Sequence, residues 1–160
     1  MVDFRIGIGY DIHRLAEGRK LILAGVEVPH TQGLQGHSDA DVVCHALCDA
    51  LLGAAAFGDI GTHFPDTDER YAGSYSVKLL CDVLELVKNA GYEVSNVDVT
   101  IHAERPKLQS YISEMRRVLA EALQIPIDRV SLKAKTNEKM DAIGRCEAIA
   151  ATAVALIYKS

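Results

Sequence analysis

The chain has 160 residues, 49% of them apolar, and its 17 basic and 22 acidic residues give a formal charge of -5. We expect one domain spanning residues 1–160, because a chain of this length buries roughly 70% of its unfolded surface. The charge balance argues against non-specific nucleic-acid binding, and no apolar stretch approaches the length of a membrane span. A strand pattern follows Met1 almost at once, so we expect no targeting peptide and a cytoplasmic protein of bacterial type, although a processed plastid protein would look the same.

The chain begins with patterns typical of β-structure. Apolar and other residues alternate from Phe4 to His13, which predicts a strand. Residues 21–28 then predict a short β-hairpin around a central Ala-Gly pair, and residues 33–36 predict a loop.

The first helix is predicted to begin at Ser38, because Asp41 follows three positions later in a pattern close to a capping box. It is expected to run to Ala54, with His45 at the edge of its core-facing stripe. Residues 57–71 are rich in turn formers, and a polar loop of this length is usually functional or disordered.

The second half of the chain predicts two helices and three strands. Helical spacing of apolar residues covers residues 77–87, after a predicted Ser74 cap, and residues 108–122. Alternation predicts strands over residues 97–103, 130–134 and 149–158. The last segment is rich in alanine and also suits a helix, but we favour a strand.

This order of elements predicts an α+β sandwich, a single domain in which helices cover one face of one mixed β-sheet. The opposite face is expected to carry polar residues, namely Thr100, His102, Ser131, Lys133 and Thr152. A face of this kind could meet neighbouring subunits around a symmetry axis, so we expect an oligomer.

The pair Asp11-x-His13 predicts a metal site when it is combined with His45. Residues two apart on a strand project from the same face, and two imidazoles with one carboxylate form a zinc ligand set that leaves a fourth position for substrate. Asp41 and Asp49 lie one helical turn either side of His45 and could accept a hydrogen bond from its second ring nitrogen. The alternatives are that Asp11 and His13 occupy the solvent face of an edge strand, and that both helix acids are merely solvated.

Two further segments are candidate binding sites. His37-Ser38 stands where a helix is expected to begin, and the free amides of a helix start bind anions. Residues 133–139 place ammonium, hydroxyl, amide and carboxylate groups after a strand, where Glu138 could share Mg²⁺ or Mn²⁺ with phosphate oxygens. Read alone, this second segment could equally be a solvated turn.

Blocks of sequence along nearly the whole chain resemble the 2-C-methyl-D-erythritol 2,4-cyclodiphosphate synthase family. They are Gly9-Tyr10-Asp11-Ile12-His13, residues 37–42, residues 45–54, Gly58-Asp59-Ile60-Gly61, Phe64-Pro65-Asp66-Thr67-Asp68, residues 97–100, Arg105-Pro106-Lys107 and residues 133–139. The resemblance implies a homotrimer whose sheet faces pack around a three-fold axis, with active sites between adjacent subunits. It also implies closure of 4-diphosphocytidyl-2-C-methyl-D-erythritol 2-phosphate to the cyclic diphosphate with release of CMP.

The same resemblance implies roles for individual residues. Asp11, His13 and His45 would hold one Zn²⁺ per subunit, and Glu138 would hold a second divalent ion, Mg²⁺ or Mn²⁺. His37 and Thr136 would be catalytic. The residues expected to bind substrate are Ser38, Asp59, Ile60, Gly61, Phe64, Pro65, Asp66, Thr67, Asp68, Ala103, Glu104, Arg105, Pro106, Lys107, Leu108, Gln109, Lys135, Asn137 and Arg145.

One stretch departs from the family pattern. Ala142 stands where an aromatic residue is common, and Cys146 and Ala148 replace glycines around the retained Arg145 and Glu147. Two other functions use the same metal ligands: a zinc-dependent phosphohydrolase acting on a nucleotide diphosphate, and a non-catalytic module in which zinc braces the fold.

Overall fold

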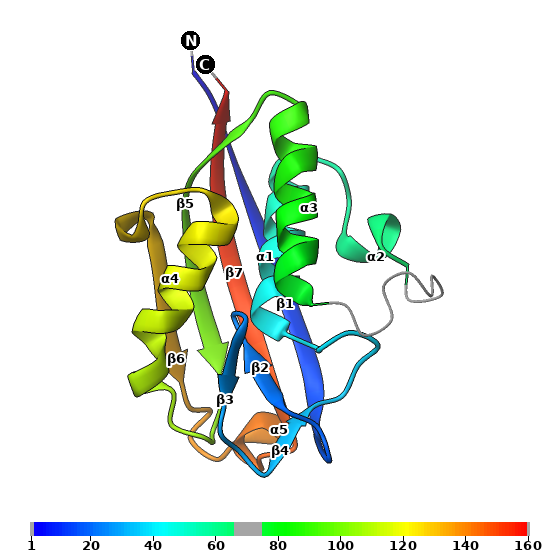
Figure 1. Cartoon of the computed structure of the whole chain (residues 1–160), viewed down its shortest axis with the longest axis vertical. Helices are drawn as coiled ribbons and strands as arrows, with labels where there is room; N and C mark the ends of the chain where they lie inside the picture. Colours follow the sequence, from blue (N-terminus) through cyan, green and yellow to red (C-terminus); the bar gives the residue numbers. More distant parts are fainter. Residues whose placement is uncertain (1, 66–74, 160) are drawn as a thin grey trace.

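The computed structural model describes residues 2–65 and 75–159, in which helices cover one side of a five-stranded sheet (Figure 1). The strands are β1 Asp3–Glu17, β4 Gln32–Leu34, β5 Glu93–His102, β6 Val130–Lys135 and β7 Ala148–Lys159. They lie in the order β4-β1-β7-β5-β6; β5 and β6 run parallel and the other pairs are antiparallel. The predicted α+β fold with a mixed sheet is therefore confirmed, as is the strand assignment of the alanine-rich segment.

Five α-helices lie in the described residues: α1 Val42–Ala54, α2 Ile60–His63, α3 Ser76–Asn89, α4 Ile112–Leu123 and α5 Asp141–Gly144. Short 3-10 turns cover Gln109–Tyr111 and Ile127–Arg129, and the predicted hairpin is formed by β2 Leu21–Leu23 and β3 Val26–Val28. Helix α1 is apolar on nearly all sides and is buried against the sheet and α3, which is the environment that such a sequence requires. None of the helices in the described ranges has the length and apolarity needed to cross a membrane.

Two glycines bring β1 directly onto the backbone of α1. A Cβ at Gly7 would lie 2.0 Å from the carbonyl oxygen of Ala50, and one at Gly9 would lie 1.9 Å from that of Ala46. The helix therefore rests on the strand without intervening side chains. This close approach brings the residues that follow Gly9 on β1 near the first turns of α1.

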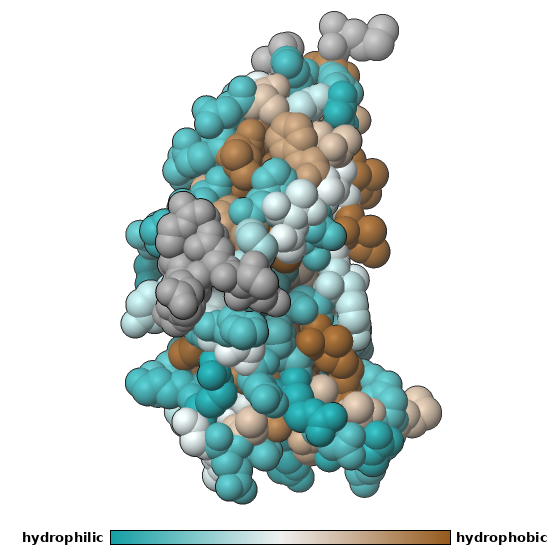
Figure 2. All heavy atoms as spheres, turned by 90° about the vertical axis from the view of Figure 1, so that its right-hand side faces the viewer, coloured by the Kyte–Doolittle hydropathy of each residue, from teal (hydrophilic) through white to brown (hydrophobic). Residues whose placement is uncertain are grey.

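The apolar side chains of β1 consequently occupy the face of the sheet that points away from the helices. These residues are 43% to 71% exposed: Phe4, Ile6, Ile8, Tyr10 and Ile12. Figure 2 shows brown side chains projecting along that side of the molecule. The prediction of a polar open face was thus only partly right: it holds for β5 and β6, where Asp98, Ser131 and Lys133 are exposed, whereas β1 adds an apolar stripe.

Several predicted boundaries were wrong. Helix α1 begins at Val42 because Asp41, not Ser38, caps it by accepting hydrogen bonds from the amides of Val43 and Cys44. Part of the predicted loop at residues 33–36 is strand, since residues 32–34 pair with β1. The start of the third predicted helix is a 3-10 turn, and the predicted cap Ser74 lies outside the described residues.

Candidate metal centre and active site

The structure brings Asp11, His13 and His45 together at the contact between β1 and α1. Asp11 Oδ2 lies 3.1 Å from His13 Nε2 and 2.9 Å from His45 Nδ1, and the three candidate ligand atoms all lie within 4.8 Å of one another. Asp11 and His13 project toward the helix rather than into bulk solvent, and all three side chains are half-buried. The reading of Asp11 and His13 as solvent-facing residues of an edge strand does not fit this arrangement.

Hydrogen bonding fixes which ring nitrogen of His13 faces the candidate metal site. Its Nδ1 lies 2.6 Å from the carbonyl oxygen of Gln35, and because a carbonyl can only accept, Nδ1–H donates. Nε2 is then the ring nitrogen that faces Asp11, and a bound cation would take its lone pair. Gly36 makes room for the ring, since a Cβ there would lie 3.1 Å from His13 Cε1.

The charge of Asp11 also suits a cation. Burial alone would raise the pKa of this carboxyl, but hydrogen bonds and charge from His13 and His45 bring it well below its usual range. Tetrahedral zinc with bonds of about 2.0–2.1 Å to nitrogen and oxygen separates its ligand atoms by about 3.3 Å. The 2.9 and 3.1 Å separations lie within a few tenths of an ångström of that value, so the donor set and its spacing fit the ion.

Among the described residues, neither helix acid hydrogen-bonds to His45, whose ring nitrogens face Asp11 and Ser76. Asp41 is fully buried, and its carboxylate accepts the amides of Ala24 and Gly25 at 2.9 and 2.7 Å as well as capping α1. Burial raises its pKa, with a further contribution from the charge of Asp39. Asp49 accepts the amide of Ile60 at 2.7 Å and so ties α2 to α1. Both acids are structural, which corrects the prediction that either would orient His45 and also the reading of them as solvated.

The predicted anion site at the start of α1 is also not formed as expected. The helix amides of Val43 and Cys44 are already taken by Asp41. Ser38 Oγ instead accepts the amide of Ala40 at 3.1 Å and lies 3.3 Å from His45 Nε2. Ser38 therefore lies beside a metal ligand, and His37, the residue before it, is exposed.

Helix α2 brings a second group of predicted residues toward the same region. Asp59 caps it by accepting the amide and hydroxyl of Thr62 at 2.9 and 2.8 Å, and these bonds lower the pKa of the exposed Asp59 carboxyl. Gly61 and Phe64 follow in the sequence. Asp49, which lies one helical turn after His45 on α1, holds α2 in place through the amide of Ile60. The next predicted residue, Pro65, is exposed. Asp66, Thr67 and Asp68 lie outside the described residues.

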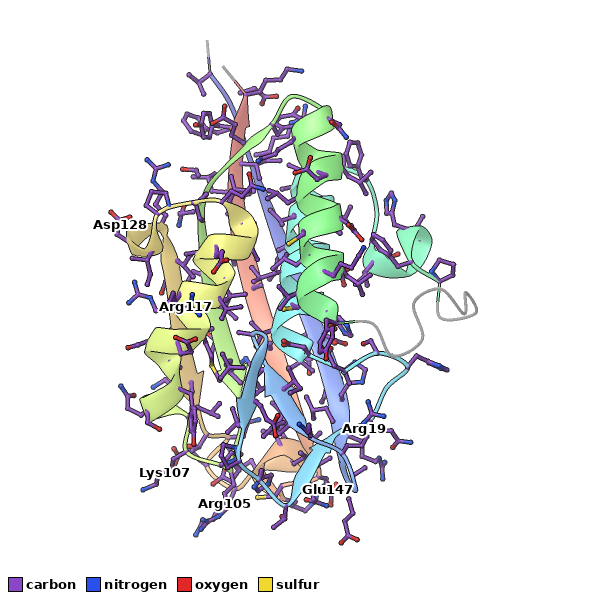
Figure 3. All side chains as sticks on the ribbon, in the orientation of Figure 1. Arg19, Arg105, Lys107, Arg117, Asp128 and Glu147 are labelled. Atoms are coloured by element: carbon purple, nitrogen blue, oxygen red, sulfur yellow. The ribbon has the colours of Figure 1, made fainter. Side chains whose placement is uncertain are left out.

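The predicted substrate-binding residues 103–109, with Lys135 and Asn137, form a separate cluster after β5 and β6. The amide of Ala103 donates to the carbonyl of Lys135 at 2.9 Å, and Glu104 accepts the amides of Asn137 and Lys139 at 3.2 and 3.3 Å. The remaining residues of the two segments adjoin these contacts along the chain: Arg105, Pro106, Lys107, Leu108, Gln109, Thr136 and Glu138. Figure 3 shows Arg105 and Lys107 at the end of the molecule that also carries Glu147. Thr136 Oγ1 donates to Glu138 Oε1 at 3.0 Å.

The strand register separates this cluster from the metal centre. Lys135 pairs with His102, His102 with Ala150, and Ala150 with Ile12, the residue between Asp11 and His13. Three strand spacings across the sheet amount to roughly 14 Å. Within one chain, the two clusters therefore lie at the same level of the sheet but on strands well apart.

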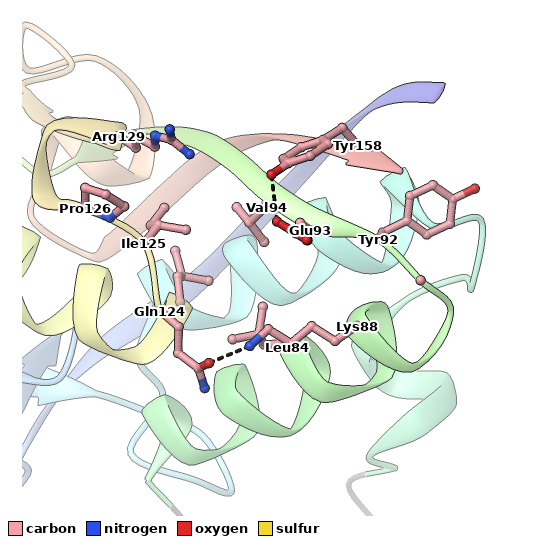
Figure 4. Close-up of a pocket in the computed structure, with 12 residues that line it drawn as sticks. Leu84, Lys88, Tyr92, Glu93, Val94, Gln124, Ile125, Pro126, Arg129 and Tyr158 are labelled. Atoms are coloured by element: carbon pink, nitrogen blue, oxygen red, sulfur yellow. Dashed lines mark hydrogen bonds between the residues drawn. The ribbon is translucent and has the colours of Figure 1, made fainter. Parts of the chain in front are cut away.

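The stretch that departs from the family pattern holds an ion pair in a tight turn. Arg145 Nε lies 2.9 Å from Glu147 Oε1. Between them Cys146 has φ 59°, a left-handed conformation that favours glycine. A cavity of about 450 Å³ near the opposite end of the sheet contains no predicted site residue (Figure 4).

Sequence reasoning missed the outer partners of the metal ligands. The carbonyl of Gln35 carries no side-chain signal, and the hydroxyl of Ser76 comes to 2.9 Å from His45 Nε2 across 31 residues of sequence. Asp39, which contacts Ser76, lies in the block of residues 37–42 that resembles the family, but its sequence position predicted no role for it.

Comparisons with known proteins identify the family and agree with the fold. The model of the YgbB family matches residues 4–158. The chain belongs to this family. It is 55% identical to the 2-C-methyl-D-erythritol 2,4-cyclodiphosphate synthase of Brachyspira hyodysenteriae, over 98% of this chain and 99% of that protein. It is 56% identical to the synthase of Porphyromonas gingivalis strain W83, over 96% of this chain and 95% of that one.

Solved structures extend the family likeness to three dimensions. A 2C-methyl-D-erythritol-2,4-cyclodiphosphate synthase, also solved in a form with bound CDP, superposes with a TM-score of 0.89 and 40% identity, covering 96% of this chain and 99% of that one. The bifunctional IspDF of Campylobacter jejuni gives a TM-score of 0.96 and 38% identity over the whole of this chain. This chain spans 43% of that bifunctional protein.

Proposed function

We propose that this chain is a cyclodiphosphate synthase of the non-mevalonate isoprenoid pathway, a phosphorus-oxygen lyase. It closes 4-diphosphocytidyl-2-C-methyl-D-erythritol 2-phosphate to 2-C-methyl-D-erythritol 2,4-cyclodiphosphate and releases CMP. The observation that carries the proposal is the assembled Asp11-His13-His45 set in a chain that matches synthases of this name along nearly its full length.

The reaction requires no protein nucleophile. An oxygen of the substrate's own 2-phosphate attacks the β-phosphorus; the bond from that phosphorus to the bridging oxygen breaks, and the electron pair leaves with CMP. Orienting two groups that repel one another can contribute on the order of 7 to 11 kcal/mol to an intramolecular reaction. Burial raises the pKa of the Cys44 and Cys48 thiols well above their usual range, so neither is suited to be a nucleophile.

Zn²⁺ held by Asp11, His13 and His45, with Mg²⁺ or Mn²⁺ at Glu138, would supply positive charge for the transferring and leaving phosphates. In a chain with a net charge of -5, the other cations near the phosphates must be local. His37 and Thr136 would stabilise the transition state. Ser38, Asp59 and Gly61 would hold the methylerythritol part, and the clustered residues 103–109 and 135–137 would hold cytidine.

We further propose a homotrimer with active sites between subunits. The metal centre and the cytidine cluster of one chain lie two to three strand spacings apart, roughly 10–14 Å across the sheet, and this separation supports an active site completed by a second copy. The apolar stripe of β1, from Phe4 to Ile12, supports burial of the open sheet face around the three-fold axis. The synthases from bacteria to which the chain is similar support a cytoplasmic location.

The test is incubation of the purified protein with the cytidine substrate, followed by phosphorus NMR with and without Zn²⁺ and Mg²⁺. We expect a cyclic diphosphate and CMP. Linear products would instead favour a zinc-dependent phosphohydrolase.

The variants Asp11→Ala and His45→Ala distinguish catalysis from bracing of the fold. Both are expected to remain folded trimers without turnover, while Asp3→Ala, an exposed carboxylate at the start of β1, serves as the matched control. If both variants unfold and chelation leaves wild-type turnover intact, zinc braces the fold and the proposed role is wrong.

A further inference from the structure

The outer nitrogen of His45 meets a buried serine from a distant part of the chain. Ser76, the first residue of α3, is fully buried, and its Oγ lies 2.9 Å from His45 Nε2. Asp39, in the segment before α1, holds this serine twice: Oδ1 accepts the Ser76 hydroxyl and Oδ2 accepts the Ser76 amide at 3.1 Å. A continuous chain of contacts therefore runs from Asp39 through Ser76 and His45 to Asp11.

The chemistry of these groups fixes the direction of the hydrogen bonds. A carboxylate only accepts, so the Ser76 hydroxyl donates its one proton to Asp39. The serine oxygen is then left as an acceptor, and in a neutral ring His45 Nε2 must carry the proton that it accepts. When a cation displaces the proton of His45 Nδ1, which faces Asp11, the ring keeps its one remaining proton on Nε2, where Ser76 accepts it; this is the form in which imidazole binds a metal.

The neighbouring serine does not compete with this arrangement. Ser38 Oγ is farther from His45 Nε2, at 3.3 Å, and it already accepts the amide of Ala40. Its hydroxyl can donate to Ser76 Oγ, 3.4 Å away, which adds a second donor to the serine oxygen and reinforces its role as an acceptor.

We propose that Asp39 and Ser76 are positioning residues that hold His45 in its Nε2–H form and thereby set the affinity of the Asp11-His13-His45 site for zinc. The identity of the ion rests on the proposed function. His13 is held by a backbone carbonyl, whereas His45 is held by a side chain, so only the outer hydrogen bond of His45 can be removed by replacing the partner side chain. Loss of an outer partner of a metal ligand typically weakens binding about 10 to 100-fold.

A purely structural role is the alternative, because Asp39 also satisfies the first amide of α3. The decisive measurement is therefore the state of the His45 ring in the zinc-loaded protein: which nitrogen carries the proton, and how fast that proton exchanges with solvent. Two-bond proton–nitrogen NMR reports which ring nitrogen is protonated, at a pH where the rings are neutral. His13 is an internal control, since its own outer bond to Gln35 is unaffected by changes at Ser76.

The variants are Ser76→Ala, Ser76→Thr and Asp39→Asn, with Ser113→Ala in the exposed first turn of α4 as a matched control. Zinc affinity is measured by chelator competition. Ser76→Ala and Asp39→Asn are expected to bind zinc about 10 to 100-fold more weakly and to let the Nε2–H proton of His45 exchange with solvent faster. Ser76→Thr keeps the hydroxyl and should retain both properties, and Ser113→Ala should change neither.

Several results would overturn the proposed positioning role of Asp39 and Ser76. An Nδ1–H tautomer of His45 in the zinc-loaded wild-type protein would do so at once, even if every variant failed to fold. Unchanged zinc affinity in a folded Ser76→Ala protein, or weaker binding with the exchange of the His45 Nε2–H proton unchanged, would leave Asp39 and Ser76 with a capping role alone. These readouts do not depend on turnover. A wild-type protein that binds zinc with His45 held by Ser76, but forms no cyclic product, would refute the proposed function and leave the positioning role of Asp39 and Ser76 intact.

Discussion

Replacing Gly9 with alanine should separate the two halves of the metal centre. The added Cβ would lie 1.9 Å from the carbonyl oxygen of Ala46 and 2.8 Å from the amide nitrogen of Ala50. Both are backbone atoms, so no side-chain rotation can relieve the contact. Because ordinary contact begins at 3.4 Å, α1 and β1 must move apart by about 1.5 Å, the difference between the two distances.

That displacement acts directly on the ligands. His45 precedes Ala46 on α1, and Asp11 lies two residues after Gly9 on β1, so the gap opens between Asp11 Oδ2 and His45 Nδ1, now 2.9 Å apart. A misplacement of about 1 Å can reduce activity by roughly 100-fold. Overpacking of this kind costs about 1–3 kcal/mol of folding free energy, or more. We expect zinc binding and turnover to fall by about two orders of magnitude in a protein that is destabilised but folded.

The control is Gly53→Ala, the same change within α1. A Cβ at Gly53 would have Ile8 O as its nearest atom, at 3.9 Å, so it meets no obstruction. This variant should bind zinc normally and gain about 0.5–1 kcal/mol of stability from its better helix propensity. Chelator competition and urea unfolding measure both variants. If Gly9→Ala folds with wild-type zinc affinity, the direct contact of β1 with α1 does not set the ligand geometry and the reasoning fails.

Three further predictions concern single positions. Gly36→Ala should press on the ring of His13 and weaken zinc binding about tenfold in chelator competition; unchanged affinity would show that the ring can shift freely. Cys146→Gly should raise the free energy of unfolding in urea by up to about 1 kcal/mol by relieving a left-handed φ, and a loss of stability would contradict this. The hydrogen bond from Lys133 lowers the pKa of the half-exposed Asp98 carboxyl. At a pH above the ordinary carboxyl pKa of about 3.9, this pair should therefore add about a few tenths of a kcal/mol to the free energy of unfolding. The contribution should be lost as the pH falls through the lowered pKa of Asp98. Unfolding of Asp98→Asn and wild type compared at pH 7 and below pH 3 checks the sign, which is wrong if the difference grows in acid.

The sequence predicted the strands and the pairing of Asp11 with His13 because a two-residue period is a local property of an extended chain. It could not predict which face of β1 would be covered. Apolar Phe4, Ile6 and Ile8 would ordinarily be assigned to the core. Instead, the face of β1 that carries the glycines between them packs on the helix, because only glycine lets a helix backbone come so close.

The helix start shows a second limit of local reasoning. Ser38 and Asp41 are both good caps, and only the tertiary structure decides between them. Asp41 is chosen because the hairpin brings the amides of Ala24 and Gly25 onto the same carboxylate. Ser38 is thereby left free to lie beside His45, where it faces the metal centre instead of satisfying a helix.

The same sheet explains why the candidate site is divided between two places. Its helix-covered face holds Asp11 and His13 against α1, where burial and fixed hydrogen bonds make the ligands rigid. The loops that follow β5 and β6 lie at the same level but two and three strands away, beside an open face with an apolar stripe on β1. A single copy therefore presents a finished cation site and a separate, exposed set of nucleotide-binding candidates. Association through the open face would bury that stripe and allow the nucleotide residues of one copy to approach the metal centre of another, so oligomer formation and completion of the active site would be one event.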